Sequence, residues 1–190
     1  MAACDAKSGR FLGNSLEYPG IAPEPARIPL SSSIHDFKVT TADGGERTLE
    51  DFRGKAVLVV NTASRCGLTP QYEGLEALRA RYAARGFEVL AFPANDFLWQ
   101  EPGSNEEIQQ FCRTKFGTTF PVFAKISVKG KEIAPLYSWL TKDSGFPGDI
   151  EWNFAKFLVA PDGKVVARFH PKVEPLAPEV IEQVEAALPA

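Results

Sequence analysis

The pattern of apolar and polar positions in the middle of the chain predicts a strand, a helix and a second strand. Residues 55–63, KAVLVVNTA, form a short apolar run rich in valine, which is typical of a strand buried on both faces. A helix should follow, with Thr69 as its cap and Pro70 in its first turn, because apolar residues then recur at helical spacing. Gly86 ends this helix, and FEVLAF at 87–92 is the next strand. The order predicts two parallel strands with a right-handed crossover.

The remaining regular segments complete an α/β pattern. Residues 37–49 alternate around Gly44-Gly45 and predict a hairpin, and a second helix should begin at Ser104, where Glu107 completes a capping box. Further candidates are a strand at 121–128, a short helix at 135–139, two strands around a turn within 157–169 and a helix at 178–188. We therefore predict an α/β domain with a central mixed β-sheet flanked by helices and an N-terminal β-hairpin.

The first 30 residues differ from the rest. Proline and serine are frequent at 18–33 and neither a helical nor a strand period is present, so we predict an extended N-terminal arm at 1–30 and one domain at 31–190. The arm lacks the pattern of a secretory signal, which favours a cytoplasmic location. Ala-Ala-Cys-Asp around Cys4 resembles the end of a bacterial lipoprotein signal, and a periplasmic or membrane-anchored protein is the alternative. A surface cysteine on the arm is the simpler interpretation of Cys4.

Composition narrows the classes of function. Of the 190 residues, 44% are hydrophobic and 24% charged, and the net charge is −3 with no basic stripe. This balance argues against nucleic acid and anionic membrane surfaces as partners, and no apolar run is long enough for a membrane span. The three cysteines lack zinc spacing and only two histidines could assist, so we expect neither a metal nor a cofactor.

Cys66 is the candidate reactive residue. It lies alone between a predicted strand and a predicted helix start, where helix amides and the helix dipole favour the nucleophilic thiolate. An inert core cysteine is the alternative, but the neighbours Ser64, Arg65 and Gly67 are not typical of a core. The thiolate could attack a disulfide, an acyl group or a peroxide. Acyl transfer would need a histidine base and disulfide exchange a nearby second cysteine, whereas peroxide chemistry needs mainly polar donors around the sulfur.

Three motifs supply such donors: NTASRCGLTPQY at 61–72, LAFPANDFLWQEPGSNEEI at 90–108 and GDIEWNFAKFLVAPDGKVVARF at 148–169. Together they resemble the glutathione peroxidase family in its cysteine form, over about residues 31–187. The resemblance implies a thioredoxin-like fold and an active-site tetrad. The tetrad would consist of Cys66 as the peroxidatic residue, Gln100, Trp152 and Asn153. The last three carry N–H donors that stay uncharged, although each alone could be a packing, surface or turn residue.

The resemblance also implies a reaction and its partners. A thiol-dependent peroxidase would reduce hydrogen peroxide and organic hydroperoxides through a sulfenic acid on Cys66, with glutathione or thioredoxin as the reductant. A peroxide-sensing redox relay protein, in which oxidised Cys66 signals to a partner, is the alternative. Only TKDSGFPGD joins Leu140 to Ile150, so the insertion that builds the interface of tetrameric members is missing, and a monomer or weak dimer is expected.

Two departures from the family pattern concern the site. Ala94 and Asp96 replace the usual cysteine and glutamine of Pro-Cys-Asn-Gln-Phe, and the added carboxylate could disfavour a thiolate nearby. Cys112 lies one residue before the family's resolving cysteine, where this chain has Arg113. One helical step rotates a side chain by about 100°, which moves Cys112 onto the apolar face. We therefore favour core packing for Cys112 over a resolving role.

Overall fold

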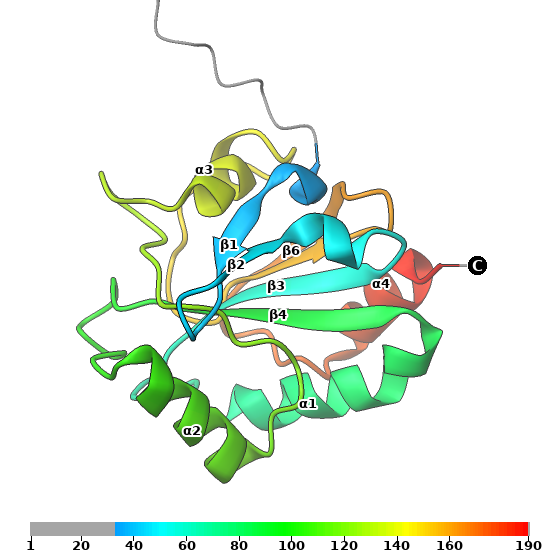
Figure 1. The fold of residues 1–190 in the computed structure, drawn as a ribbon. Helices are drawn as coiled ribbons and strands as arrows, with labels where there is room; N and C mark the ends of the chain where they lie inside the picture. The colour runs from blue at the N-terminus through cyan, green and yellow to red at the C-terminus, as the bar shows by residue number, and fades with distance from the viewer. Residues whose placement is uncertain (1–32, 190) are drawn as a thin grey trace, which may run out of the picture.

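Two apolar runs form adjacent parallel strands in the computed structural model, which describes residues 33–189 (Figure 1). Strands β3 (Ala56–Thr62) and β4 (Phe87–Pro93) are buried along their whole lengths and pair in register, from Ala56 opposite Phe87 to Thr62 opposite Pro93. Helix α1 (Gln71–Tyr82) connects them, followed by a short 3₁₀ turn that ends at Gly86, whose φ of 80° suits glycine. The predicted βαβ unit is confirmed.

A hairpin completes the mixed sheet on the other side of β3. Strand β5 (Lys156–Val159) pairs antiparallel with β3 and with β6 (Val165–Phe169), which gives the strand order β4-β3-β5-β6. The chain reverses between β5 and β6 through Gly163, at a φ of 88°. A separate two-stranded sheet of β1 (Lys38–Thr40) and β2 (Glu46–Thr48) confirms the predicted N-terminal hairpin.

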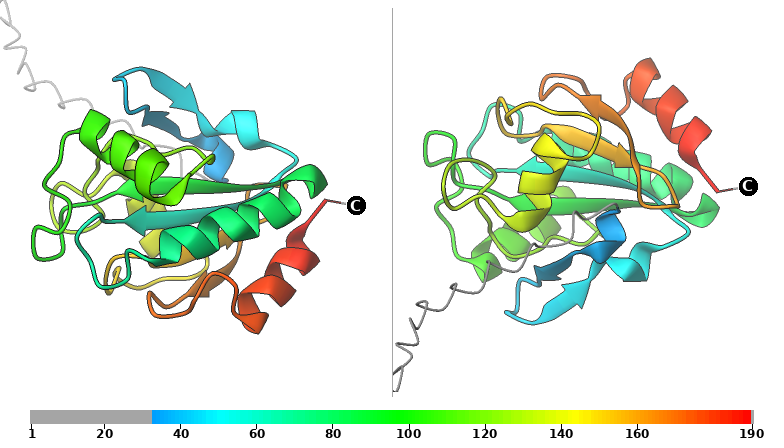
Figure 2. Two further views of the ribbon diagram at one scale, coloured as in Figure 1. Left: turned by 90° about the horizontal axis from the view of Figure 1, so that it is seen from below. Right: turned by 90° about the horizontal axis from the view of Figure 1, so that it is seen from above.

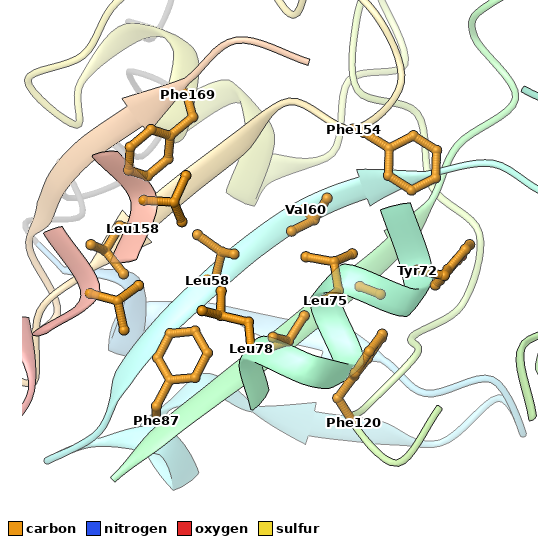
Figure 3. Packing of buried hydrophobic residues seen from close by; sticks show 14 of the residues in the cluster. Leu58, Val60, Tyr72, Leu75, Leu78, Phe87, Phe120, Phe154, Leu158 and Phe169 are labelled. Carbon is orange, nitrogen blue, oxygen red and sulfur yellow. The ribbon is translucent and has the colours of Figure 1, made fainter. Parts of the chain in front are cut away.

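Helices cover both faces of the sheet (Figure 2). On one face, α1, α2 (Asn105–Phe116) and α4 (Pro178–Ala187) share one hydrophobic cluster with alternate side chains of the sheet, such as Leu58 and Val60 of β3 (Figure 3). Within this cluster α4 lies against β5 and β6. On the other face, α3 (Pro135–Lys142) and the short 3₁₀ turns Ile34–Asp36 and Leu49–Phe52 cover Val57 and Val59. Because both faces of the sheet are buried, the sequences of its central strands are continuous apolar runs.

The capping residues in the sequence predicted the start and the end of α2 correctly. The Ser104 hydroxyl accepts from the Glu107 amide and the Glu107 carboxylate accepts from the Ser104 amide, which is the predicted capping box. Gly117 ends the helix at a φ of 62°. Helix α3 continues three residues beyond the predicted end at Trp139, to Lys142.

The predicted strand at 121–128 is wrong. This segment runs beside β4 but forms only isolated bridges, with Val122 opposite Ala91 and Ile126 opposite Ala94. Its backbone amides are divided between two neighbours: Phe123 donates to β4, whereas Ala124 donates to Thr40 of the small hairpin. Between the two bridges to β4 the segment advances four residues and β4 only three, so the register changes and no continuous ladder forms here.

No helix within residues 33–189 is long and apolar enough to cross a membrane. The predicted extended arm, including Cys4, lies outside the described part of the chain.

Candidate active site

Cys66 lies in the loop that follows β3, and 8% of its surface is exposed. The Thr69 hydroxyl holds this loop, because it accepts from the Cys66 amide at 3.0 Å and donates to the Ala63 carbonyl at 2.9 Å. Thr69 is therefore not the helix cap that the sequence predicts. Helix α1 begins at Gln71, with Pro70 at the cap position and no side-chain cap.

The sulfur of Cys66 receives a hydrogen bond from the loop itself. The Leu68 amide donates to Sγ at 3.4 Å, and the Thr69 amide donates to the Cys66 carbonyl at 3.0 Å. A turn thus separates Cys66 from α1, which begins at Gln71, one residue after the predicted start at Pro70. The Leu68 amide is a donor that can stabilise negative charge on the sulfur.

Gln100 and Asn153 meet although 53 residues separate them in the chain. The Asn153 amide Nδ2 donates to Gln100 Oε1 at 2.9 Å, and Asn153 is fully buried. The backbone carbonyl of Gln100 accepts from the Arg65 amide at 3.0 Å, which connects this pair to the residue next to Cys66. Because Oε1 of Gln100 accepts from Asn153, its Nε2 is oriented as a donor away from that contact.

Trp152 is half-buried beside the same residues. Its ring centroid lies 5.3 Å from that of Phe97, at an interplanar angle of 46°. Trp152 also packs against the hydrophobic cluster that contains Cys66. The loop of Cys66, the loop of Gln100 and the Trp152–Asn153 turn therefore come together, and all four sequence-predicted residues lie in these three adjoining segments.

Glu101 and Ser64 belong to the same region and were not singled out from the sequence. Ser64 Oγ donates to Glu101 Oε1 at 2.5 Å, and the Glu101 side chain is fully buried. This burial raises the pKa of the Glu101 carboxyl. Asn95 Oδ1 accepts from the Glu101 amide at 2.8 Å. The only signal in the sequence was the position of Glu101 directly after Gln100.

Asp96 is bound by the segment that runs beside β4. Its carboxylate accepts from Ser127 Oγ at 2.6 Å and from the Val128 amide at 2.9 Å. These bonds direct the charge toward the segment that runs beside β4. Ala94 is fully buried in the core on the α3 face of the sheet.

Two exposed apolar residues precede Gln100. Leu98 and Trp99 are 74% and 80% exposed, and both have positive φ, 52° and 56°. Left-handed backbone is uncommon for residues with a side chain and often marks functional loops. The loop therefore turns sharply outward just before Gln100.

Cys112 is fully buried on the inner face of α2 with Ile108, as predicted. Arg113, at the family's resolving position, is exposed. Burial raises the pKa of the Cys112 thiol to about 11. A thiol in this state is a poor nucleophile at neutral pH.

Comparisons with known proteins agree with these motifs. The glutathione peroxidase family model matches residues 34–141. The chain is 46% identical to a glutathione peroxidase of Lactococcus lactis over 158 residues, 82% of this chain and 99% of the relative. It is also 46% identical to the thioredoxin/glutathione peroxidase BtuE of Escherichia coli, over 84% of this chain and 99% of the relative. A hydroperoxy fatty acid reductase of Synechocystis is 46% identical, over 83% and 97%.

Comparison with solved structures identifies the fold. The crystal structure of T. cruzi GPX1 matches with a TM-score of 0.63 and 38% identity, over 82% of this chain and 95% of the other. A thioredoxin-family thiol:disulfide interchange protein from Chlorobium tepidum matches with a TM-score of 0.58 at 18% identity, over 80% and 92%, which shows a shared fold alone. The expected thioredoxin-like fold is confirmed. With its family model spanning more than half of the sequence and relatives at 46% identity, the chain belongs to the glutathione peroxidase family.

Proposed function

We propose that Cys66 is the peroxidatic residue of this thiol-dependent peroxidase, and that Gln100, Trp152 and Asn153 orient the peroxide and stabilise the charge that develops. The observation that carries this assignment is the hydrogen bond from the Asn153 side chain to the Gln100 side chain. The backbone carbonyl of Gln100 in turn accepts a hydrogen bond from the backbone amide of Arg65, next to Cys66. Uncharged amide and indole donors can stabilise a sulfur anion and a departing oxygen without competing for protons.

The proposed reaction oxidises Cys66 and then returns it to the thiol. The Cys66 thiolate attacks one oxygen of the hydroperoxide, the O–O bond breaks, and the leaving oxygen takes a proton to become an alcohol or water. Cys66 is now a sulfenic acid. A first thiol condenses with it to give a mixed disulfide and water, and a second thiol releases Cys66 as thiol together with the disulfide of the reductant.

External thiols are the proposed reductants. Cys112 is the other cysteine in the described part of the chain, and its burial and raised pKa oppose a resolving role. Glutathione and thioredoxin are both candidates, since the name of the Escherichia coli relative includes both. Fatty acid hydroperoxides join hydrogen peroxide as candidate substrates, because the Synechocystis relative is named for them. The cytoplasmic location and the monomeric or weakly dimeric state stay predictions from the sequence.

Steady-state peroxide reduction tests the proposal. The full chain is assayed with hydrogen peroxide and a fatty acid hydroperoxide, with glutathione and with a thioredoxin system side by side, and Cys66→Ser serves as the control. Sustained turnover that is lost in Cys66→Ser supports the peroxidase. A single oxidation of Cys66 without turnover by either reductant would favour the redox relay instead.

A further inference from the structure

The turn that carries Trp152 and Asn153 is held in an unusual conformation. Phe154, directly after Asn153, has a φ of 71° and is fully buried. Its ring packs edge-on against Tyr72 at 5.6 Å, near the end of β3 (Figure 3). A left-handed conformation is costly for a residue with a side chain, so surrounding contacts must maintain it.

Asn61 binds this turn on both sides of Asn153. Its side-chain Nδ2 donates to the Trp152 carbonyl at 3.1 Å, and its backbone carbonyl accepts from the Phe154 amide at 2.6 Å. These two groups belong to the two peptide bonds that flank Asn153. Because one residue holds both peptide bonds, the direction of the Asn153 side chain is set toward Gln100 Oε1, 2.9 Å away. Asn61 is fully buried near the end of β3, five positions before Cys66.

Lys156 holds the other end of the turn. Its Nζ donates to the carbonyls of Phe154 and Val173 at 2.8 Å each, and to that of Pro171 at 3.3 Å. A lysine ammonium has three donors, so these carbonyls can use all of them. The side chain is fully buried, and an amine is costly to bury unless it is hydrogen-bonded.

The same network reaches the helix that follows Cys66. Gln71, the first residue of α1, donates through Nε2 to the Pro171 carbonyl at 2.9 Å, which Lys156 also contacts. The strand before Cys66 is thus bound to the turn through Asn61, and the helix after it through Gln71, Pro171 and Lys156. Both elements that position Cys66 are connected to the backbone around Asn153.

We propose that Asn61 and Lys156 are positioning residues for peroxide reduction, which hold the Trp152–Phe154 turn so that Asn153 stays bonded to Gln100 beside the Cys66 loop. They act through Asn153 and do not touch the peroxide. The inference rests on the proposed roles of Cys66, Gln100 and Asn153.

A double-mutant cycle tests it. Asn61→Ala and Lys156→Met are made in the wild type and in Asn153→Ala, and single-turnover oxidation of Cys66 by peroxide is followed. In the wild type each substitution should slow Cys66 oxidation about 10-fold, whereas in Asn153→Ala each should change the oxidation rate by less than about 2-fold.

Thr62→Val is the matched control, since it alters a buried polar side chain next to Asn61 and should leave the rate within about 2-fold of wild type. Asn61→Leu keeps most of the volume without the donor and replaces Asn61→Ala if that variant does not fold.

A structural measurement separates this inference from the proposed function. A crystal structure of Asn61→Ala or Asn61→Leu should show the bond from Asn153 to Gln100 lost. Persistence of that bond, or equal slowing in both backgrounds, would overturn the positioning role. If the bond is lost but the wild-type protein does not reduce peroxides, Asn61 still positions Asn153, and it is the proposed function that fails.

Discussion

Ser64 and Glu101 join the Cys66 loop to the Gln100 loop through a hydrogen bond of 2.5 Å between a hydroxyl and a fully buried carboxyl. A second bond, from the Arg65 amide to the Gln100 carbonyl, runs beside it. Two consecutive residues of one loop are thus bound to two consecutive residues of the other. This pairing sets the distance between the loops on which the proposed chemistry depends.

Replacing Glu101 should reveal the cost of burying its charge. Burial raises the pKa of this carboxyl, so the folded state binds more protons than the unfolded state above about pH 4.5. The wild type should therefore lose stability relative to Glu101→Gln as the pH rises from 4.5 to 7.5. Denaturant unfolding of both proteins at several pH values measures this difference. A difference that is constant with pH would contradict the buried, perturbed carboxyl.

Glu101→Ala separates the hydrogen bond from the charge. It removes the acceptor of Ser64, whereas Glu101→Gln keeps an acceptor oxygen of the same reach. We expect Glu101→Ala to be less stable than Glu101→Gln by about 1–3 kcal/mol at pH 7. Equal unfolding midpoints with equal slopes would show that the bond to Ser64 contributes nothing to stability.

The proposed site residues should differ in their effects on oxidation. Cys66→Ser should abolish peroxide reduction with the fold intact, because no other side chain can replace the nucleophilic sulfur. Gln100→Ala and Trp152→Phe should each slow Cys66 oxidation about 10-fold, since each loses a donor. Rapid-mixing measurements of thiol loss report these rates, with far-UV circular dichroism as the check on folding. Wild-type rates in both variants would show that Gln100 and Trp152 are packing residues.

Local signals in the sequence account for most of the fold. The apolar run of β3, the capping box of Ser104 and Glu107, and the glycine turns depend on residues close together in the chain, and the structure has each element where it was predicted. The segment at 121–128 was different. Its apolar pattern suits a strand, but its register against β4 changes by one residue between the two bridges, and that change depends on the tertiary arrangement.

The support around the site could not be predicted for the same reason. Asn61 binds Trp152 across 91 residues, and Ser64 binds Glu101 across 37. Thr69 looked like a cap because of its place before a helix, yet its hydroxyl is taken by Cys66 and Ala63. A polar residue in an apolar strand, such as Asn61, indicates a buried hydrogen bond, but only the fold identifies its partner.

Cys112 should be dispensable for glutathione-supported turnover. It is fully buried and its thiol has a pKa of about 11, so little thiolate is present at neutral pH. Cys112→Ala should keep activity within about 2-fold of wild type, with a modest loss of stability of about 1 kcal/mol from the smaller side chain. Mass spectrometry of peroxide-treated wild type should find Cys66 as a sulfenic acid or a mixed disulfide. A stoichiometric Cys66–Cys112 disulfide, with loss of thioredoxin-supported turnover in Cys112→Ala, would show instead that α2 opens readily.

Lys156 should make the stability of the protein depend on pH in the alkaline range. Burial lowers the pKa of this amine from 10.5 to about 7, partly opposed by the charge of Glu174. Between these two values the unfolded state binds more protons than the folded state, so the contribution of Lys156 to stability rises with pH, by at most ~1.4 kcal/mol per pH unit.

The neutral amine of Lys156 keeps two N–H donors, which suffice for the two shorter bonds, to Phe154 and Val173. The Pro171 carbonyl, at 3.3 Å from the amine, retains its bond from Gln71. The turn around Asn153 should therefore stay in place above pH 7.

Denaturant unfolding from pH 7 to 9.5 should show that wild type gains stability relative to Lys156→Met. Over the same pH range, the rate of Cys66 oxidation should change in the same way in wild type and in Lys156→Met. Parallel stability curves for the two proteins would mean that Lys156 stays charged in the folded state and that its three carbonyl partners outweigh the cost of burial.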